Sequence, residues 1–246
     1  MTHLRLATWL LMPVALAALL LLAACGGSGN SGSSTPTPAS SANLDQHVVQ
    51  QLRDLAAKWA AANAKITYES SSTSGSLSTQ TTAILYEDLP NSRIDVVNAD
   101  TAITVISRAD SGYSCSMQGS QSSCTALSTT EAETAADVIP FLGELSRTDS
   151  TSKIIAGATS MDVATPQTVA GKSTTCIHAS GNLGQITGEA TWCFSGDGLI
   201  LSQAFKGNAT TFTMTATKVE QTQASDFDPP FPVVTAPPSA SPTSSQ

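Results

Sequence analysis

The sequence predicts an α+β fold in which one large, strongly curved antiparallel sheet packs against a few helices. Three observations predict it. An amphipathic helix precedes six short runs of alternating apolar and polar residues, and four more runs follow a helical insert. Turn residues separate the runs at short intervals, which favours antiparallel neighbours joined by hairpins.

The predicted helix begins at Asn43, whose side chain can cap it, and Gln46 three residues later can complete a capping box. Apolar residues recur at helical spacing after it and form one stripe: Leu44, Val48, Leu52, Leu55, Trp59 and Ala62. We expect the indole of Trp59 to anchor this helix in the core, against the sheet.

The period changes to two after Lys65. The predicted strands are 65–72, 77–87, 92–98, 101–108, 112–117, 122–127, 172–180, 187–195, 198–206 and 209–220. The last strand is the plainest, because its apolar residues alternate with threonines and predict one apolar and one hydroxylated face. Residues 130–146 favour a helix that Pro140 divides into two short ones. Residues 151–168 show no clear pattern.

The first 24 residues are typical of a targeting segment. A positive charge at Arg5 precedes an almost wholly apolar stretch, 6–22. The sequence Leu22-Ala23-Ala24-Cys25 then resembles a bacterial lipobox, which implies cleavage before Cys25 and acylation of that residue. We therefore expect an exported protein that is lipid-anchored to the outer face of the cell membrane. An uncleaved transmembrane helix and an ordinary signal peptide are the alternatives.

Composition shifts along the chain predict four segments. The signal peptide covers 1–24, and the acylated cysteine with a flexible Gly/Ser/Thr/Pro linker covers 25–42. The folded domain covers 43–232, and a disordered Pro/Ser/Thr-rich tail covers 233–246.

The chain has five cysteines, an odd number for an exported protein. If Cys25 carries lipid, the other four can form two disulfides. We expect the pairs Cys115–Cys124 and Cys176–Cys193, because each pair brackets turn residues and neighbouring antiparallel strands bring cysteines within bonding reach. A four-cysteine zinc site is the alternative, but the spacing contains no C-x-x-C pair.

Composition argues against several function classes. The net charge is −8 with only 11 Lys and Arg residues, so no nucleic-acid partner is expected. The chain has only three histidines, so few imidazole ligands are available for a metal site. The segment 170–174 has Pro166 where a phosphate-binding loop needs glycine. We expect no cofactor, no metal, no catalytic residues and no enzymatic activity, although a Ser–His–Asp set that uses His47 or His178 stays open.

The order of these features resembles the LolA/LolB/RseB-type lipoprotein-carrier superfamily, including its LppX/LprG-like anchored members. The resemblance rests on the leader, the Trp-ended helix, the Thr-rich strands, the helical insert, the hairpin at 193–201, Ala216-Thr217 and the ending Asp226-Phe227-Asp228-Pro229-Pro230. It implies an incomplete β-barrel around an N-terminal helix and a short helical insert, with an apolar cavity between them.

Strand alternation gives the candidate lining residues of such a cavity. They are Ile84, Tyr86, Ile94, Val96, Ile103, Val105, Phe212 and Met214, together with Phe141, Leu142 and Leu145 of the insert. Ordinary core packing is the alternative role for each of them.

The resemblance implies a non-enzymatic carrier or chaperone that binds a lipid or the acyl chains of a lipoprotein. Acylation would make the membrane its other partner. A sensor or protein-interaction module on the same scaffold, with a protein partner, is the alternative function.

Overall fold

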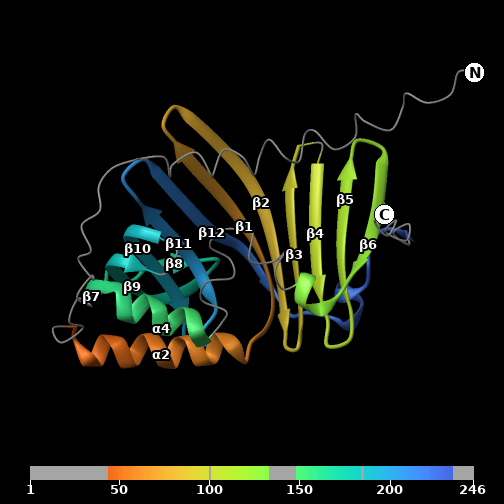
Figure 1. Ribbon diagram of the computed structural model, residues 1–246. Coiled ribbons are helices and arrows are strands. Elements are labelled where there is room, and N and C mark those ends of the chain that lie inside the picture. Colours follow the sequence, from red (N-terminus) through yellow and green to blue (C-terminus); the bar gives the residue numbers. More distant parts are fainter. Residues whose placement is uncertain (1–43, 100, 133–147, 184–185, 235–246) are drawn as a thin grey trace, which may run out of the picture. The chain divides into compact units, whose positions relative to one another are not determined.

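The computed structural model describes residues 44–99, 101–132, 148–183 and 186–234. All of them belong to one unit that runs from Ala39 to Gln246 (Figure 1). The predicted leader, the predicted acylation site Cys25 and the predicted linker lie outside the described residues. So do the insert residues Phe141, Leu142 and Leu145, and the end of the predicted tail.

Helix α2, Gln46–Ala60, is the amphipathic helix that the sequence predicts. Its cap is Asp45, whose carboxylate accepts a hydrogen bond of 2.8 Å from the His47 backbone N–H. This corrects the predicted cap at Asn43, which precedes the described residues. The predicted apolar stripe is buried at Leu44, Val48, Leu52, Leu55 and Trp59 and half-buried at Ala62, and Val49 and Ala56 are buried beside it.

Six strands follow α2 within two residues of the predicted bounds. They are β1 Asn63–Ser74, β2 Leu77–Asp88, β3 Asn91–Asn98, β4 Thr101–Ser107, β5 Gly112–Gln118 and β6 Gln121–Leu127. Because consecutive strands pair antiparallel throughout, this half of the sheet is a simple meander.

Most of the predicted helical insert, 130–146, lies outside the described residues. Residues 129–132 are helical, and Ser128 and Glu131 exchange hydrogen bonds in a capping box. A further helix, α4 Thr148–Gly157, occupies part of the stretch that shows no clear pattern. Its Ser- and Thr-rich sequence has weak helix propensity, and burial of Ile154 and Ile155 in the core stabilises it.

The remaining elements include the four other predicted strands. They are β7 Ala158–Ala164, β8 Thr168–Val169, β9 Lys172–Leu183, β10 Ile186–Ser195, β11 Ile200–Lys206, β12 Thr210–Glu220, the 3-10 helix η2 Ala224–Phe227 and β13 Val233–Val234. Strand β13 pairs with β6, so ordered structure extends two residues beyond the predicted domain end at 232.

The strands form one 13-stranded sheet in the order β13-β6-β5-β4-β3-β2-β1-β12-β11-β10-β9-β7, with β8 attached to β9. Only the β13–β6 pair is parallel among the described strands. The order runs from β13 to β7 without closing, and the sheet is curved, so the predicted α+β incomplete barrel is confirmed. Figure 1 shows α2 and α4 next to each other, on the side of β7 to β12.

The two faces of the sheet bury different clusters. We call the face that packs against α2 the inner face; Ile66, Leu85 and Ile94 lie on it, in the main core with Leu52 and Trp59. The opposite, outer face carries a second cluster, in which Phe227 of η2 packs with Tyr86 and Ile106. Both faces of the meander are therefore partly covered, by a helix on one side and by the C-terminal segment on the other.

Both cysteine pairs are disulfide-bonded as predicted. Cys115 and Cys124 lie directly opposite each other on β5 and β6, and Cys176 and Cys193 do so on β9 and β10. Each bond therefore joins neighbouring strands of a hairpin, and all four side chains are buried.

The turn between β10 and β11 lies directly against the end of α2. The Lys58 ammonium donates a hydrogen bond to the Gly196 carbonyl, at 3.0 Å. Gly198 has φ +86°, and a Cβ there would lie 2.3 Å from the Lys58 Cβ. Only glycine fits both this backbone conformation and this close approach. The turn thus fixes the position of α2 on the inner face.

We predict that Gly198→Ala lowers the free energy of unfolding by about 2 kcal/mol or more, because it adds backbone strain and a clash with α2. Gly196→Ala is the matched control in the same turn, since its Cβ would meet nothing within 4 Å. Urea denaturation measures both. Equal stabilities of the two variants would contradict this account of the turn.

Candidate functional site

Four of the predicted lining residues come together on the inner face of β3 and β4. Ile94 lies opposite Val105, and Val96 lies opposite Ile103. Ile94 and Val105 are buried, whereas Ile103 is 47% exposed. The strands thus present an apolar surface that continues the main core outward, and Ile103 leaves part of it accessible.

Two further predicted residues lie on the inner face of β12. Met214 is buried in the main core, opposite Ser70 of β1. Phe212 is partly buried against that core, and Phe205 of β11 lies opposite it. These side chains belong to the part of the sheet on the other side of β1 from β3 and β4, and Met214 lies in the same core cluster as Ile94.

The structure places Ile84 and Tyr86 on the outer face, which corrects their predicted inward orientation. Residues 83–86 are apolar at every position, so alternation fits either face. The register decides: Leu85 lies between Ile66 and Ile94, which puts Ala83 and Leu85 in the main core. Ile84 and Tyr86 pack instead with Ile106 and Phe227.

Beyond β4 the inner face becomes hydroxylated. Ser114 and Ser116 of β5 follow Val105 and Ile103 in the register, and Thr125 and Ser123 of β6 follow them in turn. An apolar region on β2 to β4 therefore borders a hydrogen-bonding region on β5 and β6. An apolar region beside a hydrogen-bonding region suits an amphipathic ligand.

Glu87 is the one charged residue on the inner face of β1 to β6, as the register places the described side chains. It lies opposite Ala64 of β1 and Ser92 of β3. Burial raises the pKa of its carboxyl to about 7. Sequence reasoning missed Glu87, although its spacing from Ala83 and Leu85 assigns it to their face.

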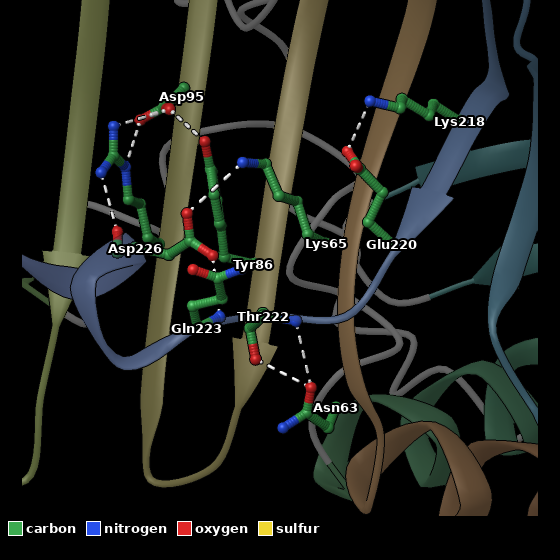
Figure 2. Close-up of polar contacts among 10 residues, drawn as sticks. Asn63, Lys65, Tyr86, Asp95, Lys218, Glu220, Thr222, Gln223 and Asp226 are labelled. Carbon is green, nitrogen blue, oxygen red and sulfur yellow. Dashed lines mark hydrogen bonds and ion pairs between the residues drawn. The ribbon is translucent and has the colours of Figure 1, made fainter.

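Polar contacts on the outer face hold the C-terminal segment to the meander (Figure 2). The Arg93 guanidinium donates two hydrogen bonds to the Asp95 carboxylate, at 2.8 and 2.9 Å, and a third, at 2.7 Å, to the Asp226 carbonyl. The Tyr86 and Thr104 hydroxyls also donate to Asp95. Asp95 is thereby buried with four hydrogen bonds.

The Lys65 side chain adds a second link to this segment. Its ammonium pairs with the Asp226 carboxylate at 3.3 Å and lies 4.8 Å from the centroid of the Tyr86 ring. The Asn63 side-chain oxygen accepts hydrogen bonds from the backbone N–H and the hydroxyl of Thr222, which precedes Asp226 in the same segment. These contacts attach 222–227 to β1, β2 and β3. We call this group of contacts the outer clamp.

A hollow of about 500 Å³ lies over the middle of β1, β2 and β12 and the end of β3. It is lined by Glu69, Ser70, Ser71, Gln80, Thr81, Thr82, Val97, Asn98, Ala99, Thr213 and Thr215. The lining is mainly hydroxyl and amide, and no predicted lining residue borders it. It is therefore not the apolar cavity that the sequence resemblance implies.

The described residues contain neither a metal-binding cluster nor a membrane-spanning helix. No group of three His, Cys, Asp or Glu side chains in the described ranges is placed to hold a metal ion. No helix formed by residues that the structure describes has the length and apolar character needed to cross a membrane.

No protein-family model matches this sequence, and no curated protein matches it either. The fold is similar to that of a solved structure, MucB. MucB is 12% identical with a TM-score of 0.53, over 76% of this chain and 64% of MucB. A Pseudomonas aeruginosa MucA/MucB complex is 10% identical (TM-score 0.49; 74% of this chain, 61% of that one). Mycobacterium tuberculosis lipoprotein LppX is 12% identical (TM-score 0.47; 75% and 100%).

The likeness to MucB concerns the fold alone, since identity is low and this chain spans less than two thirds of the MucB chain. The chain therefore has a fold similar to that of MucB, and its open sheet agrees with the incomplete barrel that the sequence resemblance implies.

We predict that Arg93→Met lowers the free energy of unfolding by about 3 kcal/mol, because it leaves the buried Asp95 carboxylate without its cation. Lys218→Met is the matched control: its ion pair with Glu220 has a similar distance, 2.9 Å, but is exposed. We expect the control to change stability by less than about 0.5 kcal/mol. Urea denaturation tests both, and similar losses would show that the outer clamp contributes no more than a surface ion pair.

Glu87 predicts a specific dependence of stability on pH. Its carboxyl has a pKa of 4.5 in the unfolded chain and about 7 when folded. Between these values the folded state binds the proton more tightly, so stability falls as pH rises through that range. Glu87→Gln should therefore raise the free energy of unfolding by about 2 kcal/mol at pH 8 and change it little at pH 4.5. Equal effects at both pH values in urea denaturation would contradict the burial of this carboxyl.

Proposed function

We propose that this protein is an exported lipoprotein, anchored through acylated Cys25 to the outer face of the cell membrane, that binds a lipid or acylated ligand. It would act as a carrier or chaperone without covalent chemistry. The ligand's acyl chain would lie along the inner face of β2, β3 and β4, where Ile94, Val96, Ile103 and Val105 come together.

The observation that carries this proposal is the accessible apolar surface around Ile103. A branched apolar side chain that is 47% exposed in the middle strands of a sheet leaves favourable burial unused. Each methylene of an acyl chain that leaves water gains about 0.8 kcal/mol, so even a short stretch of contact contributes measurably to binding. The sheet does not close, which leaves a route to this face.

Three further features support the proposed location. The lipobox-like sequence ends at Cys25, and a long Gly- and Ser-rich segment separates it from the domain. The two disulfides suit an oxidising compartment outside the cytoplasm. The acidic composition disfavours adhesion to anionic headgroups, so the anchor rather than the surface would hold the protein at the membrane.

A protein-interaction module is the second candidate function. The likeness to MucB favours it, because MucB has also been solved in complex with MucA. Crosslinking in intact membranes distinguishes the two: a specific protein partner without bound lipid supports the module, and bound lipid without a partner supports the carrier.

We predict that Ile103→Glu reduces ligand binding at least tenfold, because it places a charge on the apolar inner face without disturbing a buried side chain. Val97→Glu is the matched control. Val97 is also β-branched and exposed, at 36%, but its side chain lies on the outer face.

The measurement is photocrosslinking of the full-length protein in phosphatidylcholine vesicles with a monoacylglycerol that carries a diazirine in its acyl chain. The wild type and Val97→Glu should give equal yields on β2 to β4 peptides, and Ile103→Glu should give little. Absence of crosslinks in the wild type, or equal loss in both variants, would rule out ligand binding at the inner face.

A further inference from the structure

The inner face of the meander is almost free of charge. Alternation assigns one residue in two of each strand to this face, and the pairings of β1 to β6 show no register shift. The side chains so assigned are apolar, hydroxylated or amide, with the single exception of Glu87. The outer face of the same strands carries the charges, including Lys65, Arg93 and Asp95.

Glu87 borders the apolar region directly. Along β2 it comes two residues after Leu85, on the same face, and Leu85 is buried beside Ile94. The facing side chains are uncharged: Ala64 and Ile66 on β1, and Ser92 and Ile94 on β3. Tyr68 is the titratable group of β1 on this face; burial raises its pKa, so it stays neutral. The buried stripe of α2 is uncharged as well.

We propose that Glu87 selects the ligand by charge: the inner face accepts acyl ligands whose polar group is uncharged and rejects those with a fixed negative charge. This inference rests on the proposed function, because it names the ligand class for the same face. The ligand would be a neutral glycerolipid-like or glycolipid-like amphiphile rather than an anionic one.

The reason is the low solvation of the carboxylate. A negative charge that water screens poorly repels a second negative charge over several ångströms, and the described residues of the inner face offer no cation to offset it. The hydroxyls of Ser114, Ser116, Ser123 and Thr125 can instead donate and accept hydrogen bonds with an uncharged polar group. Discrimination should fade at acidic pH, because the raised pKa lets Glu87 take up a proton near neutrality.

The test compares two photoreactive ligands of equal chain length in the full-length protein, reconstituted in phosphatidylcholine vesicles. One is a diazirine-labelled monoacylglycerol and the other a diazirine-labelled alkyl sulfonate, whose charge is constant between pH 5 and pH 8. The readout is the ratio of crosslinks to inner-face peptides, normalised to the amount of each ligand in the vesicles.

We expect the wild type to favour the neutral ligand about tenfold at pH 8 and less than about threefold at pH 5. Glu87→Gln should bring the ratio close to one at both pH values, by raising the sulfonate yield and not by lowering that of the monoacylglycerol. Glu69→Gln is the matched control, since Glu69 lies on the outer face of the neighbouring strand and is exposed. Its ratio should equal that of the wild type.

The outcomes separate the two proposals. If neither ligand crosslinks to the inner face of the wild type, ligand binding itself is absent. If both ligands crosslink equally in the wild type at pH 8, or Glu87→Gln keeps the preference, ligand binding stands and selection by Glu87 is wrong. If Glu69→Gln changes the ratio as much as Glu87→Gln does, the effect belongs to net charge and the inference fails as well.

Discussion

The position of Leu85 between Ile66 and Ile94 is the constraint on which the rest of the structure depends. A shift of β2 by one residue would turn every side chain of that strand to the opposite face. The observed register sends Leu85 and Ala83 into the core beneath α2 and leaves Tyr86 on the outer face, where Phe227 packs against it. It also places Glu87 at the margin of the apolar surface. The helix-covered core, the outer clamp and the candidate site all follow from this one alignment.

The two faces are stabilised by different physics. On the inner face, α2 contributes non-directional burial, and the close approach at Gly198 sets where the helix lies. On the outer face the apolar cluster is small, and directional polar contacts contribute more to its stability. Asp95 accepts four hydrogen bonds from Arg93, Tyr86 and Thr104 in a buried position. Removal of a hydrogen-bond partner from this network destabilises the fold, because a buried carboxylate that lacks a partner raises the free energy of the folded state.

Local patterns predicted most of the fold, and pairings between distant residues account for what they missed. Period-two runs predicted ten of the eleven described strands that have seven or more residues, and glycine predicted the turn at 196–198, because alternation and glycine are local signals. Strand β7 lies in a stretch without a clear pattern and was missed. The predicted orientation of residues 83–86 was wrong. Only the pairing of Leu85 with Ile66 and Ile94 shows which of these side chains face the core. Helix α4 carries too weak a pattern to be predicted. The outer clamp joins residues 133 and 161 positions apart, which no short window contains.

The pairing of β13 with β6 affects whether the edge of the sheet can pair with another copy of this protein. A sheet that does not close has free hydrogen-bonding groups along its outermost strands, and those groups are sites for unwanted polymerisation. Here the chain's own C-terminal segment occupies the middle of β6, where the Cys124 N–H donates to the Pro232 carbonyl. Prolines 229, 230 and 232 lack an N–H and cannot extend a ladder. Residues 229–234 thereby cover part of the hydrogen-bonding edge of β6, which is one rim of the open barrel.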